Sequence, residues 1–153
     1  MKVIMGRKLI ALGLVSCLLA CFASGCATTK SKAAPNSPFT VVEQYISALN
    51  RRDLLVLTAY VAPDLTWYSH VNNERITEVA GREALTKTLA SYFANNAQTH
   101  WTIEQAVVTG QAVAVRERSQ WRADDSSGER VSLAVYEIAD GRIARISYFL
   151  GAP

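Results

Sequence analysis

A single carboxylate interrupts an apolar face in the strand that the alternation predicts from Gln111 to Ala123. Every second residue of this segment belongs to that face, which reads Val113, Val115, Glu117, Ser119 and Trp121. A carboxylate drawn from water toward an apolar pocket has a raised pKa, which suits a general acid or base. The alternative is that Glu117 lies near the rim and pairs with an arginine of a neighbouring strand. Glu117 is therefore the leading candidate catalytic residue, with this alternative open.

Aromatic residues on predicted strands indicate a pocket for a flat, apolar ligand. All three tryptophans fall on such strands, and alternation places Trp67 on the same face as Ser69. Aromatic side chains that line a cavity suit an apolar ring, although tryptophans also serve as core or dimer-interface residues. The predicted ligand-binding residues are Trp67, Ser69, Trp101, Trp121 and Tyr148.

Two further side chains are catalytic candidates. His70 stands next to Ser69 and is either a base at the end of its strand or an ordinary loop-edge residue. Tyr45 lies on the apolar stripe of a predicted helix, so its hydroxyl needs a hydrogen-bond partner or an opening onto a cavity. His70 and His100 are the only histidines, and their spacing matches no metal-binding pair. We predict no metal and no cofactor.

Three helices are predicted in the first part of the domain, with one strand between the second and the third, and the other strands follow them. Ser37 and Pro38 are a favourable N-cap and first position for a helix, Asp53 can cap a second one that ends at Pro63, and Gly81 opens a third. A strand is predicted at 65–71, followed by a polar loop at 72–74. After Asn96 the hydrophobic period changes to two, which predicts strands at 99–108, 111–123, 130–138 and 142–150.

Turn-forming residues separate these last four strands, so we expect an antiparallel meander. The final turn, Asp140-Gly141, is a strong hairpin signal. Three N-terminal helices followed by such a sheet define an α+β fold with the helices on one face.

The order of four segments resembles the nuclear transport factor 2-like superfamily, with ketosteroid isomerase and SnoaL-like polyketide cyclases as the nearest branches. The segments are Val41 to Asp53, Ala62 to Trp67, Gly81 to Leu85 and Asp140 to Ile143. The resemblance covers about residues 38–150 and implies a cone, in which a curved sheet wraps around the helices and leaves a central pocket. Proteins of this fold include isomerases, dehydratases, epoxide hydrolases and cyclases, so the function must be argued from the site.

The isomerase site carries over only in part. The resemblance places the tyrosine that stabilises the oxyanion on Tyr45, but it places the catalytic base, an aspartate in that enzyme, on Ser69. A neutral hydroxyl cannot take a carbon-bound proton as a carboxylate does. The second oxyanion donor would fall near Leu133 or Ala134, and neither side chain can donate. We therefore do not expect the isomerase reaction itself.

The N-terminus predicts export. Lys2, Arg7 and Lys8 precede an apolar stretch from Leu9 to Ala20, the pattern of a secretory signal, with an uncleaved anchor helix as the alternative. The residues Phe22 to Cys26 resemble the lipobox of bacterial lipoproteins, whose cysteine is lipidated and becomes the new N-terminus. Cys21 is the alternative lipidation site.

The two resemblances, with the polar composition of the tether, set the predicted domain limits. They are a signal peptide at 1–25, a flexible tether at 26–37 and a nuclear transport factor 2-like domain at 38–153. No aspartate follows Cys26, which in such lipoproteins favours the outer membrane, so we expect a lipid-anchored protein of the bacterial cell envelope that faces the periplasm. The membrane would be contacted through the lipid alone.

Charge argues against nucleic acid as a partner. The chain carries a net charge of +3, but 13 basic and 13 acidic residues remain from Cys26 onward. A neutral domain lacks the basic face that duplex binding needs.

Three functions remain open. The first is a tethered, non-catalytic domain that binds a small apolar molecule. The second is an isomerase-, cyclase- or dehydratase-like enzyme that uses Glu117 or His70 with Tyr45. The third is an assembly module that forms a homodimer through its sheet, with the basic face of Arg116, Arg118 and Arg122 against a partner.

Overall fold

The computed structural model describes residues 37–95, 98–123 and 126–150. The predicted signal peptide, the tether up to residue 36, Cys21 and Cys26 lie outside these ranges. The helices and strands, in chain order, are α1 (Pro38–Arg51), α2 (Leu54–Ala59), β1 (Val61–Val71), β2 (Glu74–Ala80), α3 (Arg82–Asn95), β3 (His100–Thr109), β4 (Ala112–Ala123), β5 (Ser126–Ala139) and β6 (Arg142–Phe149).

Capping residues set the limits of the first two helices. The Ser37 side chain accepts a hydrogen bond from the backbone N–H of Thr40 at 3.1 Å, and α1 ends where Arg52 adopts a left-handed conformation with φ 58°. The Asp53 side chain then accepts from the N–H of Val56 at 3.0 Å and caps α2. Both starts match the prediction. The second helix ends at Ala59, before Pro63.

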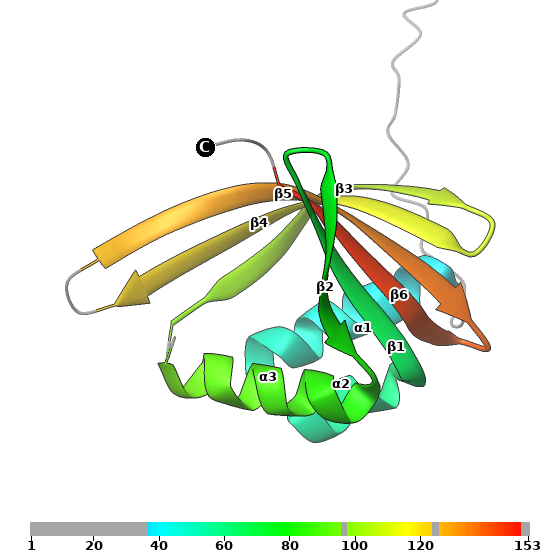
Figure 1. Ribbon diagram of the computed structural model, residues 1–153, viewed down its shortest axis with the longest axis horizontal. Coiled ribbons are helices and arrows are strands. Elements are labelled where there is room, and N and C mark those ends of the chain that lie inside the picture. The colour runs from blue at the N-terminus through cyan, green and yellow to red at the C-terminus, as the bar shows by residue number, and fades with distance from the viewer. Residues whose placement is uncertain (1–36, 96–97, 124–125, 151–153) are drawn as a thin grey trace, which may run out of the picture. The chain divides into compact units, whose positions relative to one another are not determined.

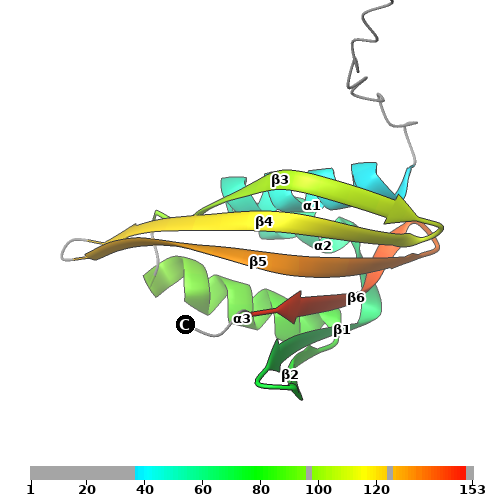
Figure 2. The ribbon, with the colours of Figure 1, turned by 90° about the horizontal axis from the view of Figure 1, so that it is seen from above.

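The strands form one sheet in the order β2-β1-β6-β5-β4-β3. The neighbours β3, β4, β5 and β6 pair antiparallel, which confirms the predicted meander. Strand β1 instead pairs parallel with β6. The helices lie together on one side of this sheet, below the arching strands in Figure 1 and behind them in Figure 2. The α+β class is confirmed.

The first hairpin corrects the sequence prediction, which gave residues 74–80 no strand and began the preceding strand at Leu65. Asn72 and Asn73 have φ of 51° and 66° and form the two-residue turn between β1 and β2. Asparagine tolerates these left-handed angles, which match the twist of a hairpin. The exposure of most of β2 explains why its residues lack the alternation of a half-buried strand.

Irregular pairing helps to curve the sheet. The register shifts between Trp67 and Tyr68, between Ile103 and Gln105, and between Glu137 and Ile138. An extra residue in one strand bends it and increases its twist. The curved sheet holds its buried residues, together with those of α1 and α3, in one hydrophobic core. Within the described ranges, no helix has the length and apolar character needed to cross a membrane.

Candidate functional site

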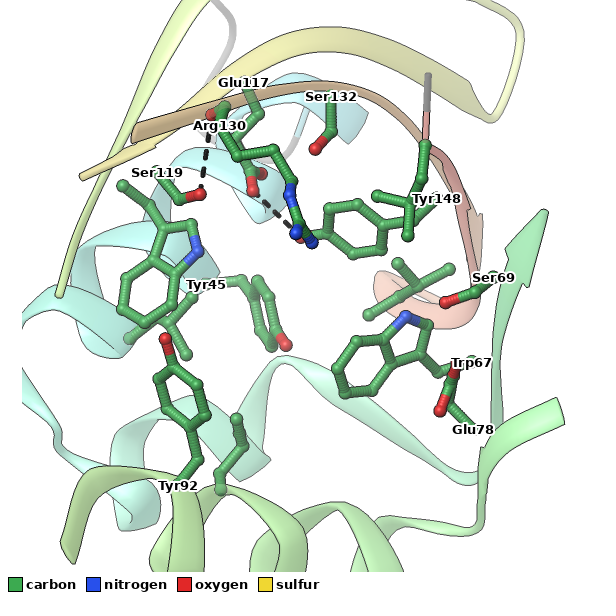
Figure 3. Close-up of a pocket in the computed structure, with 15 residues that line it drawn as sticks. Tyr45, Trp67, Ser69, Glu78, Tyr92, Glu117, Ser119, Arg130, Ser132 and Tyr148 are labelled. Carbon is green, nitrogen blue, oxygen red and sulfur yellow. Dashed lines mark hydrogen bonds between the residues drawn. The ribbon is translucent and has the colours of Figure 1, made fainter. Parts of the chain in front are cut away.

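A cavity of about 360 Å³ lies between the helices and the inner face of the sheet (Figure 3). Its volume falls within the usual range for small-molecule sites. Helices α1 and α3 contribute to its wall, as do all six strands. The lining residues are Tyr45, Leu49, Trp67, Ser69, Glu78, Leu89, Tyr92, Trp101, Glu117, Ser119, Arg130, Ser132, Ile146, Tyr148 and Leu150.

Glu117 is the buried polar centre of this cavity. Alternation along β4 turns it inward with Val113 and Val115, and only 2% of its surface is exposed. The hydroxyl of Tyr136 donates to its Oε2 at 2.9 Å, and the hydroxyl of Tyr148 donates to its Oε1 at 3.0 Å. The two tyrosine hydroxyls are 3.2 Å apart. The rim position with an arginine partner, which the sequence left open, is therefore wrong.

Burial governs the protonation of this cluster. It raises the pKa of Glu117, because the charged carboxylate is separated from water, and the hydrogen bonds from Tyr136 and Tyr148 oppose the shift. Burial also raises the pKa of both tyrosines, and the negative charge of Glu117 adds to the effect. The tyrosines thus remain hydrogen-bond donors, while the carboxyl group is set to bind a proton more tightly than an exposed glutamate does.

Tyr45 approaches the same cluster from α1. Its ring meets that of Tyr136 edge-on, with centroids 6.1 Å apart, and its side chain is almost completely buried. Burial, together with the charge of Glu117, raises its pKa. Tyr45 therefore stays neutral and presents a hydroxyl to the cavity it lines.

Trp67 and Ser69 line the opposite wall, as predicted from their shared face of β1. Ser69 is 6% exposed, and the ring centroids of Trp67 and Tyr148 are 5.8 Å apart. The Trp67 Nε1 atom is buried and has no hydrogen-bond partner in the described part of the chain. The position that the resemblance assigned to the isomerase base is thus inside the cavity but holds only a hydroxyl.

Helix α1 fixes Trp101 at the edge of the sheet. The side-chain Nδ2 of Asn50 donates a hydrogen bond to the backbone carbonyl of Trp101, and the Asn50 Oδ1 accepts one from the backbone N–H of Trp101. Both hydrogen bonds are 2.8 Å long. Asn50 therefore pairs with β3 as a neighbouring strand would, and it satisfies both backbone groups of this residue. The Trp101 ring lies 5.8 Å from that of Tyr92 on α3 and closes this side of the cavity.

Two predicted site residues lie elsewhere. His70 follows Ser69 and therefore faces the other side of β1, where it stacks on Phe149 with ring centroids 4.4 Å apart. Trp121 lies inward but beyond the cavity, with its ring against Gly128. A Cβ atom at Gly128 would come within 2.5 Å of that ring. The structure thus corrects the placement of His70 and Trp121, neither of which lines the cavity.

The sequence prediction missed several residues of the site. Tyr136 completes the carboxyl cluster, and it was detectable because it shares the inward face of β5 with Ser132 and Ala134. Arg130 lines the cavity from the same strand, and Glu78 lines it from the unpredicted β2. Glu78 had no signal in the sequence, because its strand was read as outside the sheet.

The outer face of the sheet is less basic than its sequence suggested. Arg116 and Arg118 both pair with Glu104 on β3, and Arg118 also pairs with Glu129 on β5. These neighbours neutralise two of the three arginines that were expected to meet a partner. Dimerisation through the sheet stays a prediction. In the described ranges no three His, Cys, Asp or Glu side chains cluster as metal ligands would.

The family model of the SnoaL-like domain matches residues 42–146, and the chain belongs to this family. The matched segment runs from α1 into β6 and so contains nearly every lining residue of the cavity. No curated protein sequence matches the chain significantly.

Solved structures share the fold. An LEH-like epoxide hydrolase of M. tuberculosis is 21% identical, with a TM-score of 0.61 over 74% of this chain and 82% of that one. An NTF2-like protein of unknown function from Burkholderia pseudomallei is 17% identical, with a TM-score of 0.64 over 78% and 92%. TerC, co-crystallised with polyporic acid, is 13% identical, with a TM-score of 0.63 over 77% and 92%. At such identities the likeness establishes the fold alone.

Proposed function

We propose that the domain binds a small, largely apolar molecule in its cavity. The observation that carries this proposal is an aromatic-lined space of about 360 Å³ with one buried carboxyl group. Apolar walls with few, fixed polar groups are typical of small-molecule sites. Trp67, Trp101 and Tyr148 offer the ring surfaces, and Glu117 and Tyr45 offer the polar contacts.

Native mass spectrometry of the full-length, membrane-extracted protein tests this proposal. We expect a retained organic molecule on the wild-type protein. Ser69→Leu fills part of the cavity and should abolish the retained mass, whereas Thr77→Leu on the exposed strand β2 should keep it. Circular dichroism checks that both variants fold. An adduct that survives Ser69→Leu unchanged would contradict binding in the cavity.

A second candidate function is proton transfer by Glu117 to or from the bound molecule. The favouring observation is a buried carboxyl group of raised pKa inside the cavity, with tyrosine hydroxyls beside it to stabilise charge on an oxygen of the substrate. Of the two bases considered from the sequence, Glu117 is the one that lines the cavity. The resemblance to isomerases, cyclases and dehydratases is consistent with this chemistry.

Deuterium uptake separates binding from catalysis. The retained molecule is incubated with the protein in D2O, and its mass is followed with time. Proton transfer at carbon predicts an uptake that Glu117→Gln abolishes and that Glu129→Gln, on the outer face, leaves intact. Retention without uptake on the wild-type protein would exclude the enzyme and leave the binding function.

We further propose that the domain is tethered to the outer membrane through lipidated Cys26, as the lipobox resemblance implies. Cys26→Ala should prevent processing and release the protein from the lipid anchor, and Cys21→Ala should process normally. Separation of inner and outer membranes on a density gradient gives the location. Normal processing of Cys26→Ala would instead assign the lipid to Cys21.

A further inference from the structure

Arg130 lies on the inner face of the sheet, next to the cavity. In the register of β4 and β5 it stands opposite Ser119, and both residues line the cavity. Figure 3 shows its side chain extending from β5 over the space between Glu117 and Tyr148. A strongly basic group therefore stands at the entrance to an otherwise aromatic site.

Three arginines on the outer face have acidic partners, and within the described ranges Arg130 has none. Arg116 and Arg118 pair with Glu104, and Arg145 pairs with Glu137. In residues 37–95, 98–123 and 126–150, no aspartate or glutamate forms an ion pair with Arg130. An arginine guanidinium carries a positive charge in proteins, so a positive charge is available here to a ligand.

The acidic groups of the cavity leave the guanidinium of Arg130 able to bind an anion. Both oxygens of Glu117 already accept a tyrosine hydroxyl, and burial raises the pKa of this carboxyl group, which weakens its competition for Arg130. Glu78 lines the far side of the cavity, beside Trp67 in Figure 3. The two ends of the cavity thus differ in charge. The positive end lies at Arg130 and Ser119, and the negative end lies at Glu78.

We propose that the ligand is a monoanionic organic acid whose ring system fills the aromatic cavity and whose carboxylate pairs with Arg130. The inference rests on the proposed binding function and specifies its ligand class. The planar guanidinium donates two parallel hydrogen bonds to a carboxylate, a geometry that favours it over a point charge. One arginine balances one negative charge, whereas a phosphomonoester would bring nearly two.

The test compares 2-naphthoate with its neutral counterpart 2-naphthamide. Isothermal titration calorimetry on the purified full-length protein at pH 7 gives Kd for both. A hydrogen-bonded charge predicts that the carboxylate binds about ten- to a hundredfold more tightly than the amide. Arg130→Gln should remove this preference and leave the Kd of the amide unchanged. Arg122→Gln is the matched control, because Arg122 faces outward on β4, and it should behave as the wild-type protein.

Glu78→Gln adds a test of opposite sign. Removal of this negative charge should tighten the binding of 2-naphthoate severalfold and leave 2-naphthamide unaffected. Equal affinity of the wild-type protein for the two compounds, or a preference that survives Arg130→Gln, overturns the inference while the binding function stands. If neither compound binds at millimolar concentration, the inference is overturned, and the native mass spectrometry of the wild-type protein and Ser69→Leu decides separately on the binding function.

Discussion

Charged side chains lie in different environments on the two faces of the sheet, although the same strands form both faces. On the inner face Glu117 is buried and accepts hydrogen bonds from two tyrosine hydroxyls. On the outer face the charged side chains pair with one another at the surface, as Arg145 does with Glu137. Adjacent residues of one strand therefore experience different media, because alternation places one in the cavity wall and the next in water.

The two faces therefore differ in what their charged groups contribute. A solvated ion pair contributes little free energy because water screens it, whereas a buried carboxyl group retains a shifted pKa and strong local interactions. Glu117 is therefore the residue on which the proposed proton transfer depends. The outer pairs keep the convex face polar around exposed apolar residues such as Leu133, which is 48% exposed.

The largest difference between the faces is expected for a deletion of core volume. Tyr136→Ala removes a completely buried ring and should lower the free energy of unfolding by about 3–5 kcal/mol. Leu133→Ala, on the outer face of the same strand, should cost less than about 1 kcal/mol. Urea unfolding measures both. Similar losses for the two variants would refute the assignment of inner and outer faces.

Removal of one hydroxyl probes the carboxyl cluster itself. Tyr148→Phe leaves Glu117 Oε1 without its donor and should lower the free energy of unfolding by about 1–3 kcal/mol at pH 7. Tyr68→Phe is the matched control, since Tyr68 lies on the other side of the sheet beside Arg75. Its effect should stay within about 0.5 kcal/mol. An unchanged free energy of unfolding for Tyr148→Phe would mean that Glu117 does not need this hydroxyl.

The pH dependence of stability should have opposite signs on the two faces. The pKa of Glu117 is raised, so the folded state holds the proton more tightly and the free energy of unfolding falls as pH rises above about 4.3 toward the raised value. The slope from this group is at most about 1.4 kcal/mol per pH unit. Glu117→Gln should remove it.

Glu129 on the outer face provides the contrast. Hydrogen bonding and charge from Arg118 lower its pKa, so its contribution is present above the ordinary glutamate pKa and is lost as pH falls through the lowered value. Unfolding curves of Glu117→Gln and Glu129→Gln across pH should therefore diverge from the wild type in opposite directions. A Glu117→Gln profile parallel to the wild type would contradict the raised pKa.

The smallest effect is expected for an outer ion pair. Arg145→Ala removes the contact with Glu137 and should cost less than about 1 kcal/mol, because both side chains are about half exposed. The loss should shrink in 1 M salt, which screens surface charges. Thermal unfolding at low and high salt measures it. A larger, salt-independent loss would show that this pair belongs to the packed structure.

Local patterns predicted much of the fold because their causes are local. The caps at Ser37 and Asp53 and the turn at Asp140-Gly141 depend on neighbouring residues, and the meander follows from consecutive hairpins. Strand β2 was missed because its side chains are mostly exposed and show no alternation. The parallel pairing of β1 with β6 joins segments about eighty residues apart, so no local signal reports it.

The candidate site divides in the same way. Alternation alone placed Glu117, Trp67 and Ser69 on inward faces, and the structure confirms these placements. It failed for Trp121, which shares the inward face of β4 but lies past the end of the cavity, since alternation says nothing of where along a strand a pocket stops.

The sequence by itself determined the α+β class, the order of most elements and the inward direction of Glu117, because hydrophobic period and turn chemistry are properties of neighbouring residues. Only the tertiary structure decided that Tyr136 and Tyr148, from two other strands, donate to that carboxyl group. It also decided that Arg130 lines the cavity while other arginines are paired outside. Hydrogen bonds and ion pairs across strands depend on register and curvature, and these are set when the whole sheet closes over the helices.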